Sequence, residues 1–158
     1  MALVVLAAFT CSGAGPAEAC PTPLPGSVGD TARKNAQAQA NFPILYPCYM
    51  PAAHRLESAT VTGAPGRQQV ELIFAGPFEL TIRQSQFPPA VNPDPSGASR
   101  STVDLFPNTQ AIFIERNDGS EKALYHLFWA RNGMFYELQA SGPPLQRRAI
   151  LRVATSLE

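Results

Sequence analysis

An Asn-Gly pair at residues 132 and 133 restricts the fold of this 158-residue chain more than any other feature of its sequence. The pair separates two apolar runs, residues 124–131 and 134–139. Both central residues of a tight hairpin turn of this kind need positive φ angles, which Asn and Gly adopt most readily. We therefore predict that the two runs are neighbouring antiparallel strands.

Two more hairpins are predicted from apolar residues that recur at every second position. A polar cluster at residues 117–120 is suited to a turn between the runs 111–115 and 123–130. Because short turns place successive strands side by side, the sequence predicts an antiparallel meander of about six strands. The alternating residues of the first hairpin, on either side of its turn, are Val70, Leu72, Phe74, Phe78, Leu80 and Ile82.

The C-terminal residues change to the 3.6-residue period of a helix after Pro143-Pro144. Three arginines lie off the apolar stripe, as on a solvated helix face, with a small anion site as the alternative. We expect the helix to pack on the sheet, because the strand at residues 124–129 is apolar on both faces and needs a cover on each. The stripe consists of Leu145, Ala149, Ile150, Val153, Ala154 and Leu157.

The segment before the sheet combines a helix with an extended stretch. Residues 30–41 predict a short helix that Asp30 or Thr31 can cap, because alanine recurs through the segment and favours helix. Residues 42–51 contain three prolines, which force an extended path, and we call them the strap. The predicted fold is α+β: an antiparallel sheet packed by a C-terminal helix, with a short N-terminal helix and a proline-rich strap.

The first residues are typical of an export signal. Residues 2–9 are an uninterrupted apolar run, much shorter than the roughly 20 residues of a membrane-spanning helix. Ala17-Glu18-Ala19 fits the small-residue rule for signal cleavage, so we predict a signal peptide at 1–19, a tether at 20–29 and a single domain at 30–158. No Lys or Arg precedes Arg33, whereas such signals normally begin with positive charge. The alternative is a buried N-terminal strand or helix.

The chain has three cysteines, and they also indicate a location outside the cytoplasm. Cys20 and Cys48 are expected to form a disulfide in an oxidising environment, with Cys11 removed in the signal. In the alternative, Cys11 is the acylated first residue of a lipoprotein, and its lipid is the sole connection to a membrane. Both readings place the protein outside the cytoplasm, either secreted or anchored by lipid.

Charge and motifs exclude several classes of function. The 12 Lys and Arg residues balance the 12 Asp and Glu residues, so no field draws nucleic acid to the surface. His54 follows Cys48 closely enough to suggest a nucleophilic pair or a zinc site with Cys20, but a disulfide is the expected use of both thiols. His126 is expected to be a hydrogen-bonded structural residue. We expect no catalytic residue, metal or cofactor.

Two features remain for binding. Residues 86–101 contain four prolines and no periodicity, so we expect disorder or a plain insertion, with a binding loop as the alternative. Seven aromatic residues could line an apolar groove between strap and sheet for a small ligand, or instead form a second small core. These residues are Phe42, Tyr46, Tyr49, Phe128, Trp129, Phe135 and Tyr136.

Two short motifs carry a resemblance to a known family. W-x-x-N-G-x-x-Y occupies residues 129–136, and I-x-x-V-A-x-S-L occupies residues 150–157. Together with the proline-bracketed strap and the two strand pairs, they resemble the bacterial domain-of-unknown-function family 4367, over residues 30–157. That family is found at the extracytoplasmic end of anti-sigma factors and in exported lipoproteins. The resemblance implies sensing, binding or scaffolding in the envelope, with no catalytic residues.

These observations lead to three hypotheses of function. We expect a non-enzymatic binding or sensing module of the bacterial cell envelope, whose partner is an envelope protein or a small apolar ligand. The alternative is a structural or assembly subunit of an envelope complex or surface polymer, which would use the strap or a sheet edge for contacts. The third is a small hydrolase that uses His54 or His126. Direct inhibition of a sigma factor is not expected, because the sequence predicts neither sigma-binding helices nor a membrane-spanning helix.

Overall fold

The computed structural model describes residues 20, 23–51, 53–90, 97–116, 123–142 and 146–158. Within them the chain is α+β, as predicted, with seven strands rather than about six. The additional strand is β4, which begins inside the segment 86–101 that was predicted as a loop. Its side chains are mostly polar or exposed, so the alternation that marks the other strands is weak. The elements are α1 (Val28–Gln39), β1 (Arg55–Thr62), β2 (Gln69–Ala75), β3 (Glu79–Ser85), β4 (Ser99–Phe106), β5 (Thr109–Arg116), β6 (Leu124–Arg131), β7 (Met134–Ser141) and α2 (Arg147–Thr155).

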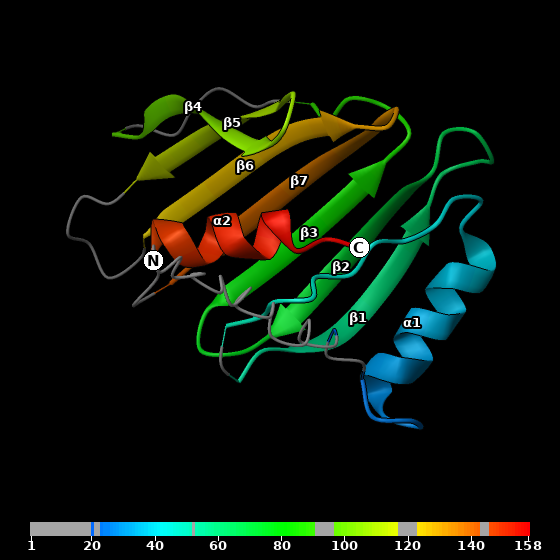
Figure 1. Ribbon diagram of the computed structural model, residues 1–158. Helices are drawn as coiled ribbons and strands as arrows, with labels where there is room; N and C mark the ends of the chain where they lie inside the picture. The colour runs from blue at the N-terminus through cyan, green and yellow to red at the C-terminus, as the bar shows by residue number, and fades with distance from the viewer. Residues whose placement is uncertain (1–19, 21–22, 52, 91–96, 117–122, 143–145) are drawn as a thin grey trace, which may run out of the picture.

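The sheet is antiparallel throughout, in the order β1-β2-β3-β7-β6-β5-β4 (Figure 1). The prediction of one continuous meander is therefore wrong, because β3 pairs with β7, with Ile82 opposite Leu138. Two meanders, β1 to β3 and β4 to β7, meet along this pair. The connection between β3 and β4 is too long for a tight turn, so β4 can lie at the far edge and β7 can return beside β3.

The Asn-Gly hairpin is confirmed. Asn132 and Gly133 have φ angles of 53° and 76°, and Arg131 lies opposite Met134 across the turn. The pairing of β5 with β6 is also confirmed, although its polar turn at residues 117–120 lies outside the described residues. Local turn chemistry thus sets the register of the central strands.

The core lies against one face of the sheet. Figure 1 shows α2 in front of this face, and Ile150, Val153 and Ala154 of α2 belong to the same buried cluster as the strands. Leu145 of the predicted stripe lies outside the described residues. The strand members that are fully buried include Val70, Leu72, Ile82, Phe113, Leu127 and Leu138.

The helix α1 begins earlier than predicted. Its N-cap is Ser27, whose hydroxyl accepts a hydrogen bond from the Asp30 backbone N–H at 3.2 Å, so neither Asp30 nor Thr31 is the cap. The helix therefore begins within residues 20–29, which were assigned to a tether. It also ends at Gln39, before Asn41, where the chain turns into the strap.

The strap is held by the C-terminal segment that follows α2. Pro47 forms a β-bridge with Leu157. The backbone N–H of Tyr46 donates to the carbonyl of Glu158 at 2.9 Å, and that of Cys48 donates to the carbonyl of Ser156 at 2.8 Å. An extended segment that proline keeps out of the main sheet thus gains strand-like hydrogen bonds from the end of the chain.

None of the helices in the described residues is both long enough and apolar enough to cross a bilayer.

Candidate functional site

A cavity of about 770 Å³ opens between α1, the strap and β1. Most of its lining is apolar, with Met50 from the strap and Leu56 and Phe74 from β1 and β2. Leu24 and Val28 stand at the same cavity with 79% and 73% of their surface exposed, and they are the exposed large apolar side chains among the described residues. Uncovered apolar side chains around a hollow of this size are typical of a ligand site.

The close approach of α1 to β1 forms one wall of the cavity. Gly29 of α1 lies so near β1 that a Cβ at this position would be 2.9 Å from the carbonyl oxygen of Leu56. A larger residue would push the helix away from the strand. The cavity wall therefore depends on a glycine that lies in the segment predicted to be a tether.

His54 forms another part of the lining. Its Nε2 lies 3.0 Å from the carbonyl oxygen of Phe78, and its Nδ1 lies 3.3 Å from that of Pro51. The imidazole also packs on the Phe78 ring, with 4.1 Å between centroids, over the backbone of Gly76. Both ring nitrogens face backbone carbonyls, so the geometry supports a structural role and not the nucleophilic or zinc site considered from the sequence.

The charged groups of the cavity are two arginines and one glutamate, Arg33, Arg55 and Glu57. The Arg33 guanidinium lies over the Tyr46 ring, 4.5 Å from its centroid. Among the described residues, no carboxylate oxygen lies within 4.0 Å of the Arg33 or Arg55 guanidinium. The lining thus carries two positive side chains and one negative side chain, and neither arginine forms an ion pair with a described carboxylate.

Tyr46 is largely buried where the strap meets the cavity. Burial raises the pKa of its hydroxyl to about 12, although the nearby Arg33 charge opposes this shift. The hydroxyl is enclosed and makes no hydrogen bond with any described residue. It is therefore neutral at physiological pH, and the ring, not the hydroxyl, is the part that lines the cavity.

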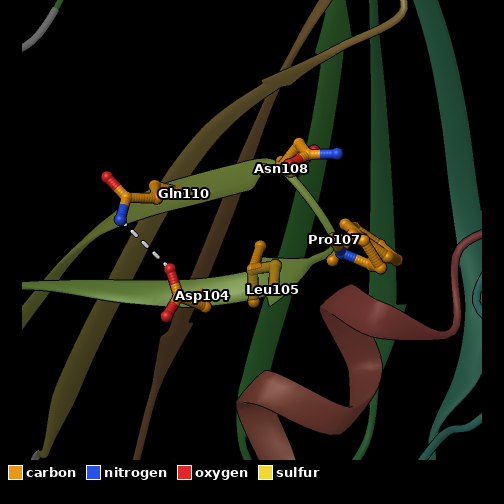
Figure 2. A pocket seen from close by; sticks show the side chains of 7 residues that line it. Asp104, Leu105, Pro107, Asn108 and Gln110 are labelled. Carbon is orange, nitrogen blue, oxygen red and sulfur yellow. Dashed lines mark hydrogen bonds between the residues drawn. The ribbon is translucent and has the colours of Figure 1, made fainter.

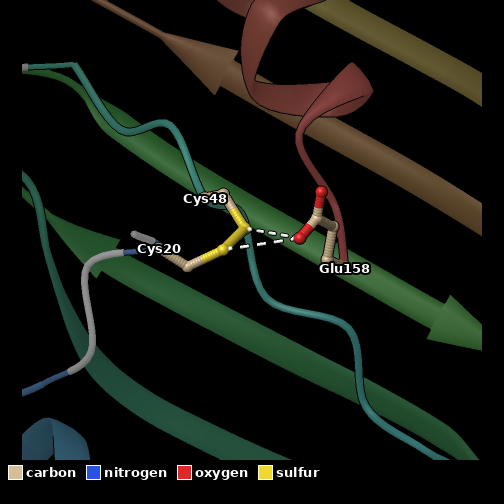
Figure 3. Close-up of side chains that lie close together, drawn as sticks. All are labelled: Cys20, Cys48 and Glu158. Carbon is tan, nitrogen blue, oxygen red and sulfur yellow. Dashed lines mark hydrogen bonds between the residues drawn. A yellow bond between two sulfur atoms is a disulfide. The ribbon is translucent and has the colours of Figure 1, made fainter. Parts of the chain in front are cut away.

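The predicted disulfide between Cys20 and Cys48 is confirmed, with 4.2 Å between the Cα atoms (Figure 3). The Glu158 carboxylate oxygen Oε2 lies 3.5 Å from the Cys20 sulfur and 3.4 Å from the Cys48 sulfur. These three side chains form the one group of metal-ligand type found in the described residues, and His54 is not part of it. The disulfide consumes both thiols, so neither can supply the thiolate that a metal would need.

The seven aromatic residues considered for a groove or a second small core do not lie together. Trp129 and Tyr136 stack across β6 and β7, with 5.2 Å between centroids, and both belong to the core. Their chain neighbours Phe128 and Phe135 point to the opposite face, because successive strand residues alternate. Of the remaining three, Phe42 is buried in the core, Tyr49 lies beneath Arg152, and Tyr46 alone lines the cavity.

The face of the sheet opposite α2 carries a row of charged side chains. Arg83 Nε lies 2.6 Å from Glu71 Oε2, and Arg83 Nη1 lies 3.3 Å from Glu137 Oε2. His126 Nε2 lies 2.8 Å from Glu137 Oε1. Burial acts to raise the pKa of Glu137, but His126 and Arg83 outweigh it and hold this pKa below the usual value of 4.5. Each carboxylate faces a cationic partner, so the row supports stabilisation more than acid–base chemistry.

A second hollow lies at the hairpin between β4 and β5 (Figure 2). It is lined by seven consecutive residues, 104–110, all from this hairpin. The side-chain amide of Gln110 donates to Asp104 Oδ1 at 3.1 Å across it. A hollow formed by a single exposed hairpin brings no distant residues together, so the cavity beside α1 is the better candidate.

No family model matches this chain, and neither does any curated protein or solved structure with which it was compared. The resemblance to domain-of-unknown-function family 4367 therefore stays a prediction. Leu24, Val28, Arg33 and Met50 were not predicted as site residues. The signal in the sequence was the presence of Leu24 and Val28, two large apolar residues in a segment that otherwise reads as a solvated tether.

Proposed function

We propose that this protein is an exported, non-enzymatic binding module whose ligand site is the cavity between α1, the strap and β1. The observation that carries the proposal is the uncovered apolar rim of Leu24 and Val28 around an apolar cavity. A ligand with an apolar part would remove these side chains from water, at roughly 25 cal/mol per Å² of buried surface. The ordered walls lower the entropy cost of binding.

The disulfide between Cys20 and the strap supports the proposed location outside the cytoplasm. Disulfides persist in oxidising compartments and are rare in the cytosol. The Cys20–Cys48 bond is therefore consistent with a cell envelope or an extracellular medium. The predicted signal peptide at 1–19, and Cys11 with it, lies outside the described residues. In this proposal α2 packs on the sheet as part of the core, and the strap forms one wall of the cavity.

Titration with the neutral dye Nile red tests the proposal, because the dye fluoresces strongly when it enters an apolar site. We expect saturable binding by the wild-type protein. The Leu24→Ser/Val28→Ser variant should bind the dye with an affinity at least about tenfold lower, because two apolar contacts are lost. Ile73→Ser, on the face opposite α2, is the matched control and should bind as the wild type does. Absence of saturable dye binding to the folded, oxidised protein would contradict the proposal.

The alternative, an assembly subunit, is favoured by the outer edge of β4. Arg100, Thr102 and Asp104 are exposed at alternate positions of this edge strand. The exposed edge of a sheet is a ready template for pairing with another chain, so two copies could pair antiparallel about Thr102.

Sedimentation equilibrium separates this alternative from a monomeric binding module. Association through β4 should be weakened by Thr102→Lys, because pairing about this residue would place the two introduced lysines opposite one another. A wild-type protein that stays monomeric at every concentration would exclude the alternative.

A further inference from the structure

We infer that the ligand of the cavity is an anionic amphiphile, with an aliphatic tail and a carboxylate head. This inference rests on the proposed function, because it assumes that the cavity is a binding site. It adds the chemical class of the ligand, which the apolar lining alone does not specify.

The charge of the cavity favours an anion. Arg33 and Arg55 contribute two guanidinium groups, against the single carboxylate of Glu57. The nearest acidic residue of α1, Asp30, has other partners: Lys34 Nζ lies 2.8 Å from its Oδ2, and the Gly26 backbone N–H donates to the same oxygen at 2.9 Å. Lys34 lowers the pKa of Asp30 more than Arg33 does, and no described carboxylate oxygen lies within 4.0 Å of the Arg33 guanidinium, so Arg33 can bind the carboxylate of a ligand.

The position of Arg33 suits recognition of a carboxylate head. Its guanidinium lies on the face of the Tyr46 ring, and this contact restricts its motion. The N–H donors of a guanidinium form a planar fork that can make two parallel hydrogen bonds with a carboxylate, a geometry that an ammonium group cannot reproduce.

The rest of the cavity suits an aliphatic tail. Leu24, Val28, Met50, Leu56 and Phe74 supply apolar surface beside Arg33. Both nitrogens of His54 already face backbone carbonyls, so the imidazole has little capacity to bind the polar groups of a sugar or a nucleotide. The volume of about 770 Å³ lies within the roughly 300–1,000 Å³ of known small-molecule sites. A mostly apolar lining with an excess of one positive charge matches an anionic amphiphile with a single head.

Displacement of bound Nile red by three probes of equal chain length tests the inference: dodecanoate, dodecanol and dodecyltrimethylammonium, each below its critical micelle concentration. We expect dodecanoate to displace the dye at an about tenfold lower concentration than dodecanol, and the cation to be the weakest. Arg33→Gln should abolish the preference for dodecanoate and leave displacement by dodecanol unchanged. Arg33→Lys should restore part of it.

Lys34→Gln is the matched control, since Lys34 is the next residue along α1, is exposed and faces Asp30. This variant should keep the full preference. Equal displacement by dodecanoate and dodecanol, or a preference for the cation, would overturn the inference while saturable dye binding still supported the proposed function. A preference for dodecanoate that survives both Arg33→Gln and Arg55→Gln would overturn it as well. If the dye itself did not bind, the proposed function would fail.

Discussion

The side chain of Gln84 hydrogen-bonds to both backbone groups of Leu45. Its amide Nε2 donates to the Leu45 carbonyl at 2.6 Å, and its Oε1 accepts from the Leu45 N–H at 2.9 Å. Gln84 is fully buried, so a side chain of β3 serves the strap as a neighbouring strand would. The side-chain amide of Gln68 likewise hydrogen-bonds to the carbonyl of residue 39 and the backbone N–H of residue 41. The amide of Gln37 hydrogen-bonds to the carbonyl of residue 42 and the backbone N–H of residue 44. Three glutamines thus hold the segment that leads from α1 to the cavity.

Replacement of Gln84 tests this arrangement. Gln84→Leu preserves bulk but leaves the N–H and carbonyl of Leu45 without their partner, so we expect a loss of about 1–3 kcal/mol in the free energy of unfolding. Urea denaturation followed by tryptophan fluorescence measures it. Gln139→Leu, on the face opposite α2, should change stability by no more than about 0.5 kcal/mol. Equal stability of the two variants would show that the Gln84 amide does not hold the strap.

Removal of the disulfide should affect both stability and binding. Cys20 and Cys48 are 28 residues apart, and closing a loop of this size stabilises the folded state by about 3.6 kcal/mol on the chain-entropy model. The Cys20→Ser/Cys48→Ser variant should lose about that amount in urea denaturation. It should also bind Nile red more weakly, because Pro23 and Leu24 of the cavity follow Cys20 closely.

Intact mass spectrometry supplies the control for this prediction. The native protein should weigh about two hydrogens less than its reduced form, and alkylation without reductant should label neither mature cysteine. The same measurement reports the N-terminus and any acyl group on Cys11. Two free thiols in the native protein would contradict both the predicted loss of stability and the proposed location.

Glu137 should make stability depend on pH in acid. Because His126 and Arg83 hold its folded-state pKa below 4.5, its contribution is complete above that pH and is lost as the pH falls through the lower folded-state value. Glu137→Gln removes this contribution, so the decline in unfolding free energy below pH 4.5 should become shallower. The exposed Glu57 serves as the matched control through Glu57→Gln. Identical pH profiles for wild type and Glu137→Gln would show that the contacts with Arg83 and His126 contribute nothing.

Gly76 and His54 should behave as a coupled pair. A Cβ at Gly76 would overlap the His54 imidazole, whose two nitrogens face the backbone carbonyls of Pro51 and Phe78. Gly76→Ala should therefore cost about 1–3 kcal/mol in unfolding free energy. His54→Ala removes the obstructing ring, so the double variant should be less destabilised than the sum of the single variants. Additive effects in this double-mutant cycle would argue against the overlap.

Some elements could be predicted because their signals are local. The turn at Asn132 and Gly133 depends on the φ angles that these two residues accept. The helix after residue 146 depends on apolar residues that recur with the period of a helix. Strand β4 was missed because an edge strand with one buried residue, Leu105, needs little apolar alternation. The seven aromatic residues that could have lined one groove are divided between separate places, since Phe128 and Trp129, for example, are neighbours in the chain and hence lie on opposite faces of the sheet.

The sequence by itself determined most of the strands and which two cysteines pair, because turn conformation and residue type act over short distances or within a very small set of choices. The tertiary structure alone decided that β3 pairs with β7 and that Leu24, Arg33 and Phe74 share a cavity. These arrangements depend on how the faces of distant elements pack together. The energies of such contacts are spread over many residues, and no local pattern in the chain records them.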